Sequence, residues 1–93
     1  MDYEKNLTQW SIIYSLFLKK QINKKYLHLY SLIHNIKYKN LYNLYFSIRN
    51  KSYLEQKNYI KKRIKFYIYK LHRNEVSLEE LDALYILYTL RFE

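Results

Sequence analysis

The chain has 93 residues and carries 17 Lys and Arg against 8 Asp and Glu, which gives a net charge of +9. It is 49% hydrophobic and contains no Gly, Pro or Cys. Without Gly and Pro, tight β-hairpin turns, Gly-rich phosphate loops and Gly-terminated helices are all disfavoured. Without Cys, disulfides, thiolate zinc sites and cysteine nucleophiles are excluded. We therefore expect a single all-α domain over residues 1–93 with an anionic partner, either nucleic acid or a membrane surface.

Charge divides the chain into three parts. Residues 1–18 carry a net charge of −1, residues 19–73 carry +14 and residues 74–93 carry −4. In the central part, fifteen Lys and Arg accompany one carboxylate, that of Glu55. Amino acids with AT-rich codons dominate the whole chain, which indicates the genome of an organelle, a reduced endosymbiont or a phage. Such a bias raises the Lys and Tyr content without selection for function, so their number alone does not establish a binding site.

The chain shows no sign of a membrane span or a targeting segment. Its longest mostly apolar runs, residues 10–18 and 26–33, are shorter than the ~20 residues that cross a bilayer. Asp2 and Glu4 do not resemble the basic start of a signal or transit peptide. We expect a protein of the organellar matrix, in particular the mitochondrial one, that is encoded by the organelle itself.

The first helix is expected to begin near Asn6 or Thr8, either of which can accept the exposed N–H groups of a first turn. Residues 19–25 are polar and form either a solvated helical stretch or a connection, since no Gly or Pro marks a boundary. We interpret residues 1–25 as an N-terminal helical extension. Its apolar face comprises Trp10, Ile13, Tyr14, Phe17 and Leu18.

Two long helices are expected next, over residues 26–49 and 53–73, with a turn at residues 50–52. We expect them to pack as a long antiparallel pair, the basic helical hairpin of residues 26–73. The helix expected over residues 26–49 carries apolar residues three and four apart: Leu29, Leu32, Ile33, Ile36, Leu41, Leu44, Tyr45 and Ile48. The helix expected over residues 53–73 carries an apolar stripe of Ile60, Ile64, Ile68 and Leu71, with Tyr59, Phe66, Tyr67 and Tyr69 among the cations.

The acidic residues 74–93 predict a capped C-terminal helix. Ser77-Leu78-Glu79-Glu80 has the form of a capping box with Ser77 as the N-cap, and Val76 and Leu81 stand where a hydrophobic staple would place them. Apolar residues cover more than one face of this helix, so it is either central to a bundle or docked on another protein. The residues expected to dock a partner protein are Leu81, Leu84, Tyr85, Tyr88 and Phe92.

Catalytic and metal-binding patterns are missing. His28 and His34 are six residues apart, which does not bring them together on a helix, and His72 is distant from both. No Ser or Thr has a recognisable base partner, and the carboxylates at residues 79–82 are explained by capping and the helix dipole. We expect no catalytic residue, no metal, no cofactor and no small-molecule substrate, so the protein is not an enzyme.

The mixture of cations and aromatic residues in the central part predicts an RNA-binding face. Lys and Arg neutralise phosphates and release counterions, while Tyr can stack on exposed bases. The alternative is a solvated helix face with lysines supplied by codon bias. We favour RNA because fifteen cations accompany Glu55 alone. The expected RNA-binding residues are Arg49, Lys51, Lys57, Lys61, Lys62, Arg63, Lys65, Lys70 and Arg73.

Two runs of the central part carry a resemblance to a known family. They are Leu41-Tyr42-Asn43-Leu44-Tyr45-Phe46-Ser47 and Ile60-Lys61-Lys62-Arg63-Ile64, the latter continuing to Ile68. Residues 28–73 resemble the two-helix protein beside the nascent-chain exit tunnel of the large ribosomal subunit (the L twenty-nine family), which has a run close to Leu-Phe-Asn-Leu-Arg-Phe-Gln and then a basic second helix. The family's turn often carries Gly or Pro, and residues 1–25 and 77–93 have no counterpart in it. The resemblance implies packing on ribosomal RNA beside other proteins of the tunnel exit.

The leading hypothesis is thus a non-catalytic structural protein bound to RNA in a large assembly, namely the large subunit of an organellar, mitochondrial ribosome. Its expected partners are ribosomal RNA and neighbouring proteins of that assembly. One alternative is an accessory subunit of an organellar respiratory complex, with its cations at lipid headgroups. Another is a phage-encoded inhibitor that binds a host protein that handles nucleic acid.

Overall fold

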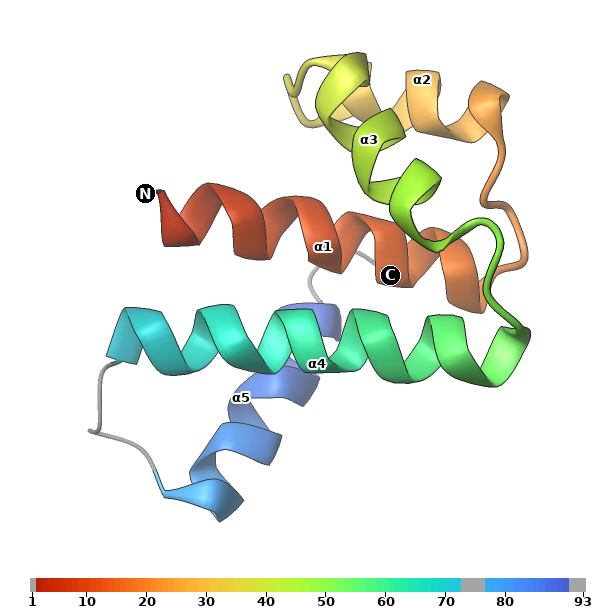
Figure 1. Ribbon diagram of the computed structural model, residues 1–93. Helices are drawn as coiled ribbons and strands as arrows, with labels where there is room; N and C mark the ends of the chain where they lie inside the picture. The colour runs from red at the N-terminus through yellow and green to blue at the C-terminus, as the bar shows by residue number, and fades with distance from the viewer. Residues whose placement is uncertain (1, 73–76, 91–93) are drawn as a thin grey trace.

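The structure is a computed structural model and describes residues 2–72 and 77–90, apart from the side chains of Leu78, Tyr88 and Thr89. These residues form α-helices and no strand, which confirms the predicted all-α class. The helices are α1 (Tyr3–Leu18), α2 (Lys24–Ile33), α3 (Tyr38–Ile48), α4 (Tyr53–His72) and α5 (Leu78–Leu90) (Figure 1).

α1 lies at the centre of the fold. It runs antiparallel to α4, and it also contacts α3 and α5 (Figure 1). Ser11 is tolerated inside the core because its hydroxyl donates to the carbonyl oxygen of Leu7 at 2.8 Å. The segment interpreted as an extension is therefore the element on which the core is built. Its buried residues are Leu7, Gln9, Trp10, Ser11, Ile12, Ile13, Ser15, Leu16 and Phe17.

α1 begins earlier than expected. The backbone N–H of Lys5 donates to Oδ1 of Asp2 at 2.9 Å, so Asp2 is the N-cap. The expected caps, Asn6 and Thr8, lie inside the helix. A carboxylate satisfies the exposed N–H groups and also favours the positive end of the helix dipole. The helix therefore begins directly after Asp2, the first acidic residue of the chain.

The single long helix expected over residues 26–49 is wrong, because α2 ends and α3 begins within it. Asn35 has a φ of 52°, in the left-handed region, and the N–H of Ile36 donates to the carbonyl oxygen of Ser31 at 2.8 Å. These bonds are those of a Schellman motif, which usually contains Gly. Asn tolerates the left-handed region better than most residues. Lys20, with a φ of 56°, ends α1 in the same way.

α4 packs along α1, and not along residues 26–49 as predicted. The physical reason is that α2 and α3 are short and pack on each other, whereas α1 offers a long apolar surface. Ile60, Ile64 and Ile68 of the predicted stripe are fully buried, and so is most of Tyr67. Tyr67 was expected among the cations, and Leu71 of the stripe is exposed.

α5 packs on α4 and α1. The predicted cap is confirmed, since the N–H of Glu80 donates to Oγ of Ser77 at 3.2 Å. Leu81 and Leu84 are half-buried and Tyr85 is 8% exposed, and all three pack against the core. These three residues, which the sequence predicted to dock a partner protein, contact the core of their own chain.

Four of the residues singled out in the sequence lie outside this description. They are Arg73, Val76 and Phe92, and Tyr88 with respect to its side chain.

Candidate nucleic-acid interface

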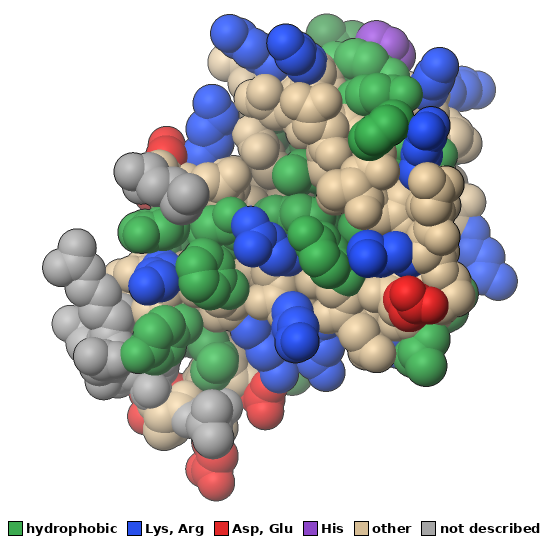
Figure 2. All heavy atoms as spheres, in the orientation of Figure 1, with side chains coloured by type: hydrophobic (Ala, Val, Ile, Leu, Met, Phe, Trp, Pro, Cys, Tyr) green, Lys and Arg blue, Asp and Glu red, His purple; other side chains and the backbone are tan. Residues whose placement is uncertain are grey.

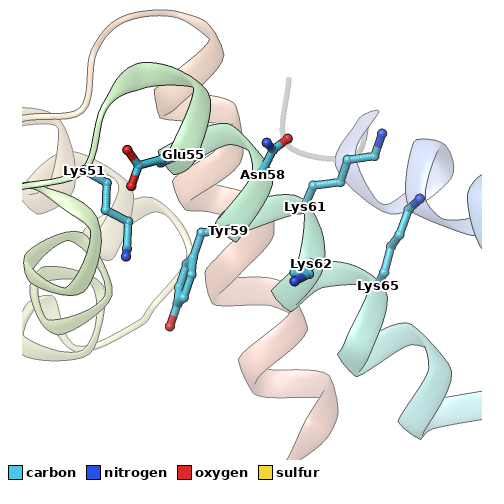
Figure 3. Close-up of a pocket in the computed structure, with 7 residues that line it drawn as sticks. All are labelled: Lys51, Glu55, Asn58, Tyr59, Lys61, Lys62 and Lys65. Atoms are coloured by element: carbon cyan, nitrogen blue, oxygen red, sulfur yellow. The ribbon is translucent and has the colours of Figure 1, made fainter.

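A shallow, open groove of about 540 Å³ runs along the solvent-facing side of α4. Lysines from four positions border it, and Tyr59 forms part of its wall (Figure 3). Across the face that contains α4, Figure 2 shows blue Lys and Arg side chains among green apolar ones, with red carboxylates over α5. The residues that line the groove are Lys51, Glu55, Asn58, Tyr59, Lys61, Lys62 and Lys65.

Packing beneath the groove holds Tyr59 in place. Its ring meets the indole of Trp10 edge-on, with 5.7 Å between the ring centroids. Nζ of Lys51 lies 5.2 Å from the centroid of the same tyrosine ring, a distance at which a cation is attracted to the ring face. Lys51 and Tyr59 extend to one side of α4, and Lys61 extends to the other (Figure 3). Lys62 is exposed on the outer surface between them.

The start of α4 holds the carboxylate of the groove. The hydroxyl of Ser52 accepts the N–H of Glu55 at 3.3 Å and donates to Oε1 of Glu55 at 3.0 Å. Glu55 thus completes a capping arrangement at the helix start. Gln56 adds a second tie, since its side-chain amide donates to the carbonyl oxygen of Ile48 at 3.0 Å. The carboxylate of Glu55 is therefore held at the beginning of the groove, away from Lys62 by about two helical turns.

Lys65 is not a free cation of this groove. It is about a quarter exposed and forms an ion pair with Asp82 of α5. Nζ of Lys61 and of Lys65 each lie 5.6 Å from the centroid of the Tyr85 ring. The ion pair lowers the pKa of Asp82, first through the hydrogen bond from Lys65 and then through its charge. Lys65 therefore joins α5 to α4, and Lys61 remains exposed beside it.

We predict that this connection between α4 and α5 weakens in acid. A carboxyl group whose pKa is lowered by folding stabilises the folded state above its unfolded value, here 3.8, and loses that contribution as the pH falls below it. In urea unfolding at a series of pH values, the Asp82→Asn variant should therefore lose less stability than the natural chain below pH 3.8. Parallel curves for the two proteins would contradict the prediction.

A second hollow of about 390 Å³ adjoins the groove, and it shares Tyr59 and Lys62 with it. Its other lining residues are Arg63 and Phe66. Nη2 of Arg63 donates to the hydroxyl of Tyr67 at 2.8 Å, so the guanidinium is held against the helix surface. The ring of Phe66 lies between Arg63 and Lys70, whose charged groups are 5.6 and 5.5 Å from its centroid. We use the name α4 ridge for the solvent-facing side of α4 that carries the two hollows. It comprises Lys51, Glu55, Asn58, Tyr59, Lys61, Lys62, Arg63, Lys65 and Phe66.

The structure brings five of the nine predicted RNA-binding residues to the α4 ridge: Lys51, Lys61, Lys62, Arg63 and Lys65. Lys70 contacts the ring of Phe66 but lines neither hollow. Arg49 is elsewhere, over the ring of Phe46 at 4.1 Å. Lys57 is exposed but lines neither hollow. The sequence prediction did not include Asn58 and Tyr59 in the site. The spacing of residues 55, 58, 59 and 62 along one face of the helix would have indicated them.

The α4 ridge offers fixed positive charge and exposed aromatic edges, which suit phosphates and bases. Among the described residues, no three His, Asp or Glu lie together as metal ligands would. Within the same residues, no helix has the length and apolar character needed to cross a membrane. Comparison of the chain with models of protein families, with curated proteins and with solved structures finds no match.

Proposed function

We propose that this protein is a non-catalytic structural component of a ribonucleoprotein assembly, and that it binds RNA through the α4 ridge. The observation that carries the proposal is the alignment of exposed Lys61 and Lys62 with Tyr59 along one open groove. Each lysine can neutralise a phosphate and release its counterion. Tyr59 is held by Trp10 and stands beside these charges with part of its surface exposed. Such a surface binds the backbone of RNA with little dependence on its sequence.

The proposed assembly is the large subunit of an organellar ribosome. The predominance of amino acids that have AT-rich codons supports an organellar origin, and the net charge of +14 over residues 19–73 supports an RNA-rich environment. The resemblance to the exit-tunnel family adds less support, because residues 28–73 fold into three helices and not into a hairpin of two. The proposal therefore depends on the α4 ridge and not on the resemblance.

We predict that two exposed lysines of α4, Lys62 and Lys57, differ in their contribution to RNA affinity. Lys62 lies in both hollows, whereas Lys57 is equally an exposed lysine of α4 and lines neither. In fluorescence anisotropy with a short RNA duplex and with oligouridine, Lys62→Glu should weaken binding about tenfold at low salt. It should also lower the slope of log K against log salt by about 1, because one phosphate contact is lost. Lys57→Glu makes the same change in net charge and should cost less than about threefold, since only long-range attraction falls.

Equal losses for the two variants would mean that net charge, and not the α4 ridge, attracts RNA. Unchanged affinity for Lys62→Glu at low salt would overturn the proposed site. The assembly is tested separately, by sedimenting an organelle lysate with and without ribonuclease. The protein should sediment with the large ribosomal subunit and be released by the nuclease.

A further inference from the structure

Two helices expose apolar side chains on the side opposite the core. α2 buries Leu27 and exposes Leu29, Leu32 and Ile33, of which Leu32 is 80% exposed. α5 buries Tyr85 and exposes apolar residues on its other side, namely Ile86 (54%), Leu87 (61%) and Leu90 (55%). Single exposed apolar residues are common, but a contiguous row on one helix face indicates an interaction surface.

The two exposed faces carry opposite charges. The first turn of α2 presents Lys24 and Lys25, and no carboxylate occurs between residues 5 and 54 of the chain. The first turn of α5 presents Glu79 and Glu80, and residues 77–90 contain no Lys or Arg. Each helix therefore begins with exposed charge of one sign and continues as an exposed apolar row. The two surfaces are complementary in charge and alike in apolar character.

The residues of the two faces also have the same spacing. On α2, Lys25 is followed after four, seven and eight residues by Leu29, Leu32 and Ile33. On α5, Glu79 is followed after the same intervals by Ala83, Ile86 and Leu87, all of them exposed. Intervals of this kind place side chains on one helical face, where they meet the corresponding residues of a parallel helix. If α2 and α5 lie parallel, Lys25 faces Glu79 and the apolar rows face each other.

We propose that the protein self-associates, with α2 of one copy packed parallel to α5 of a second copy. In Figure 1, α2 lies above α1, whereas α5 lies below and behind α4, so the exposed faces of the two helices do not pack on each other within one chain. Parallel pairing of α2 with α2, or of α5 with α5, would oppose like charges at the first turn. A contact between different surfaces of two copies is heterologous, so the pair retains one unused α2 face and one unused α5 face, and further copies can add.

The interface is small, since α2 has 10 residues and α5 has 13. Contacts of this size give weak and transient association. The apparent mass in sedimentation velocity should therefore rise with protein concentration, and high salt should reduce this rise because the Lys25–Glu79 attraction is screened. Preparations freed of RNA by nuclease and high-salt washing isolate this association from RNA binding.

Charge exchange gives the decisive experiment. Lys25→Glu places a carboxylate opposite Glu79, and Glu79→Lys places two ammonium groups opposite each other, so each variant alone should associate at least about tenfold more weakly. An equimolar mixture of the two variants should recover association. In the mixture the new carboxylate at position 25 faces the new ammonium at position 79, and the unchanged Lys25 of one variant faces the unchanged Glu79 of the other. Neither substitution is in the α4 ridge, so RNA binding reports on the proposed function independently.

Two leucines provide the matched apolar test. Leu32→Ser should abolish association, whereas Leu54→Ser, at a leucine that is 65% exposed at the start of α4, should leave it unchanged. A mass that stays monomeric at every concentration would overturn the proposal, and so would variants that fail to recover on mixing. Binding to vesicles rich in anionic lipid tests the alternative that the α2 face meets a membrane surface. Vesicle binding that Lys25→Glu abolishes and that mixing does not restore would assign the α2 face to a membrane surface instead.

Discussion

Replacing Leu16 with alanine is expected to lower the free energy of unfolding by about 3 kcal/mol, the middle of the usual range for a buried leucine. Leu16 is fully buried on the central helix α1, so the shorter alanine side chain leaves a cavity in the core. For a small domain whose total stability is about 5–15 kcal/mol, this is a large share. The melting temperature should fall by about 15 °C. The fluorescence of Trp10, the single tryptophan of the chain, reports the transition because its ring is buried on the same helix.

The matched control is Leu32→Ala, which makes the same chemical change at a residue that is 80% exposed. It should change stability by less than about 0.5 kcal/mol. Equal effects of the two substitutions would mean that α1 is a peripheral helix, in line with the interpretation of residues 1–25 as an extension. The comparison therefore tests the arrangement of the helices and not only the quality of the packing.

Periodicity predicted which residues of one helix are buried together. Ile60, Ile64 and Ile68 face the core as their spacing indicated, and the capping pattern at Ser77 placed the start of α5 correctly. These features depend on neighbours in the sequence, and local patterns report them well. The Ser52 and Glu55 pair has the same capping pattern and was available to the same reasoning.

Periodicity did not predict which helices pack together or where the long helix breaks. The apolar spacing continues through residues 33–38, and the break depends on Asn35 adopting a left-handed conformation that no Gly marked in advance. The choice of α1 as the partner of α4 depends on how much surface each candidate buries, which no single segment contains. Long-range pairing is a property of the whole chain.

The candidate site was predicted in composition but not in arrangement. Spacing shows that Lys61 and Lys62 lie on exposed parts of α4, but not that Lys65 is paired with Asp82, seventeen residues away on another helix. Such pairing removes a cation from the binding surface and assigns it to the fold. Conversely, the packing of Trp10 against Tyr59 places an aromatic ring in the groove.

Replacing Tyr85 with alanine is expected to release α5 from the rest of the fold, at a cost of about 3 kcal/mol. The Tyr85 ring is buried, and its centroid lies 5.7 Å from that of the Tyr14 ring of α1. Nζ of Lys61 and of Lys65, both on α4, each lie 5.6 Å from the same Tyr85 centroid. It therefore joins α5 to both long helices. Hydrogen exchange should accelerate in the amides of α5 and remain slow in those of α1. The control Leu87→Ala, at a residue that is 61% exposed, should leave both unchanged.

The hydroxyl of Tyr85 gives the same contact a dependence on alkaline pH. Burial, followed by the neighbouring Tyr14 hydroxyl, raises the pKa of Tyr85 above its ordinary value of 10.0. Because the packed state disfavours the ionised phenol, stability is retained below pH 10.0 and lost as the pH rises above it. Tyr85→Phe keeps the ring and removes the hydroxyl group that ionises, so α5 should stay packed and resist alkali better than in the natural chain. If both proteins lost α5 protection at the same alkaline pH, the contact between α5 and the long helices would not depend on a neutral Tyr85.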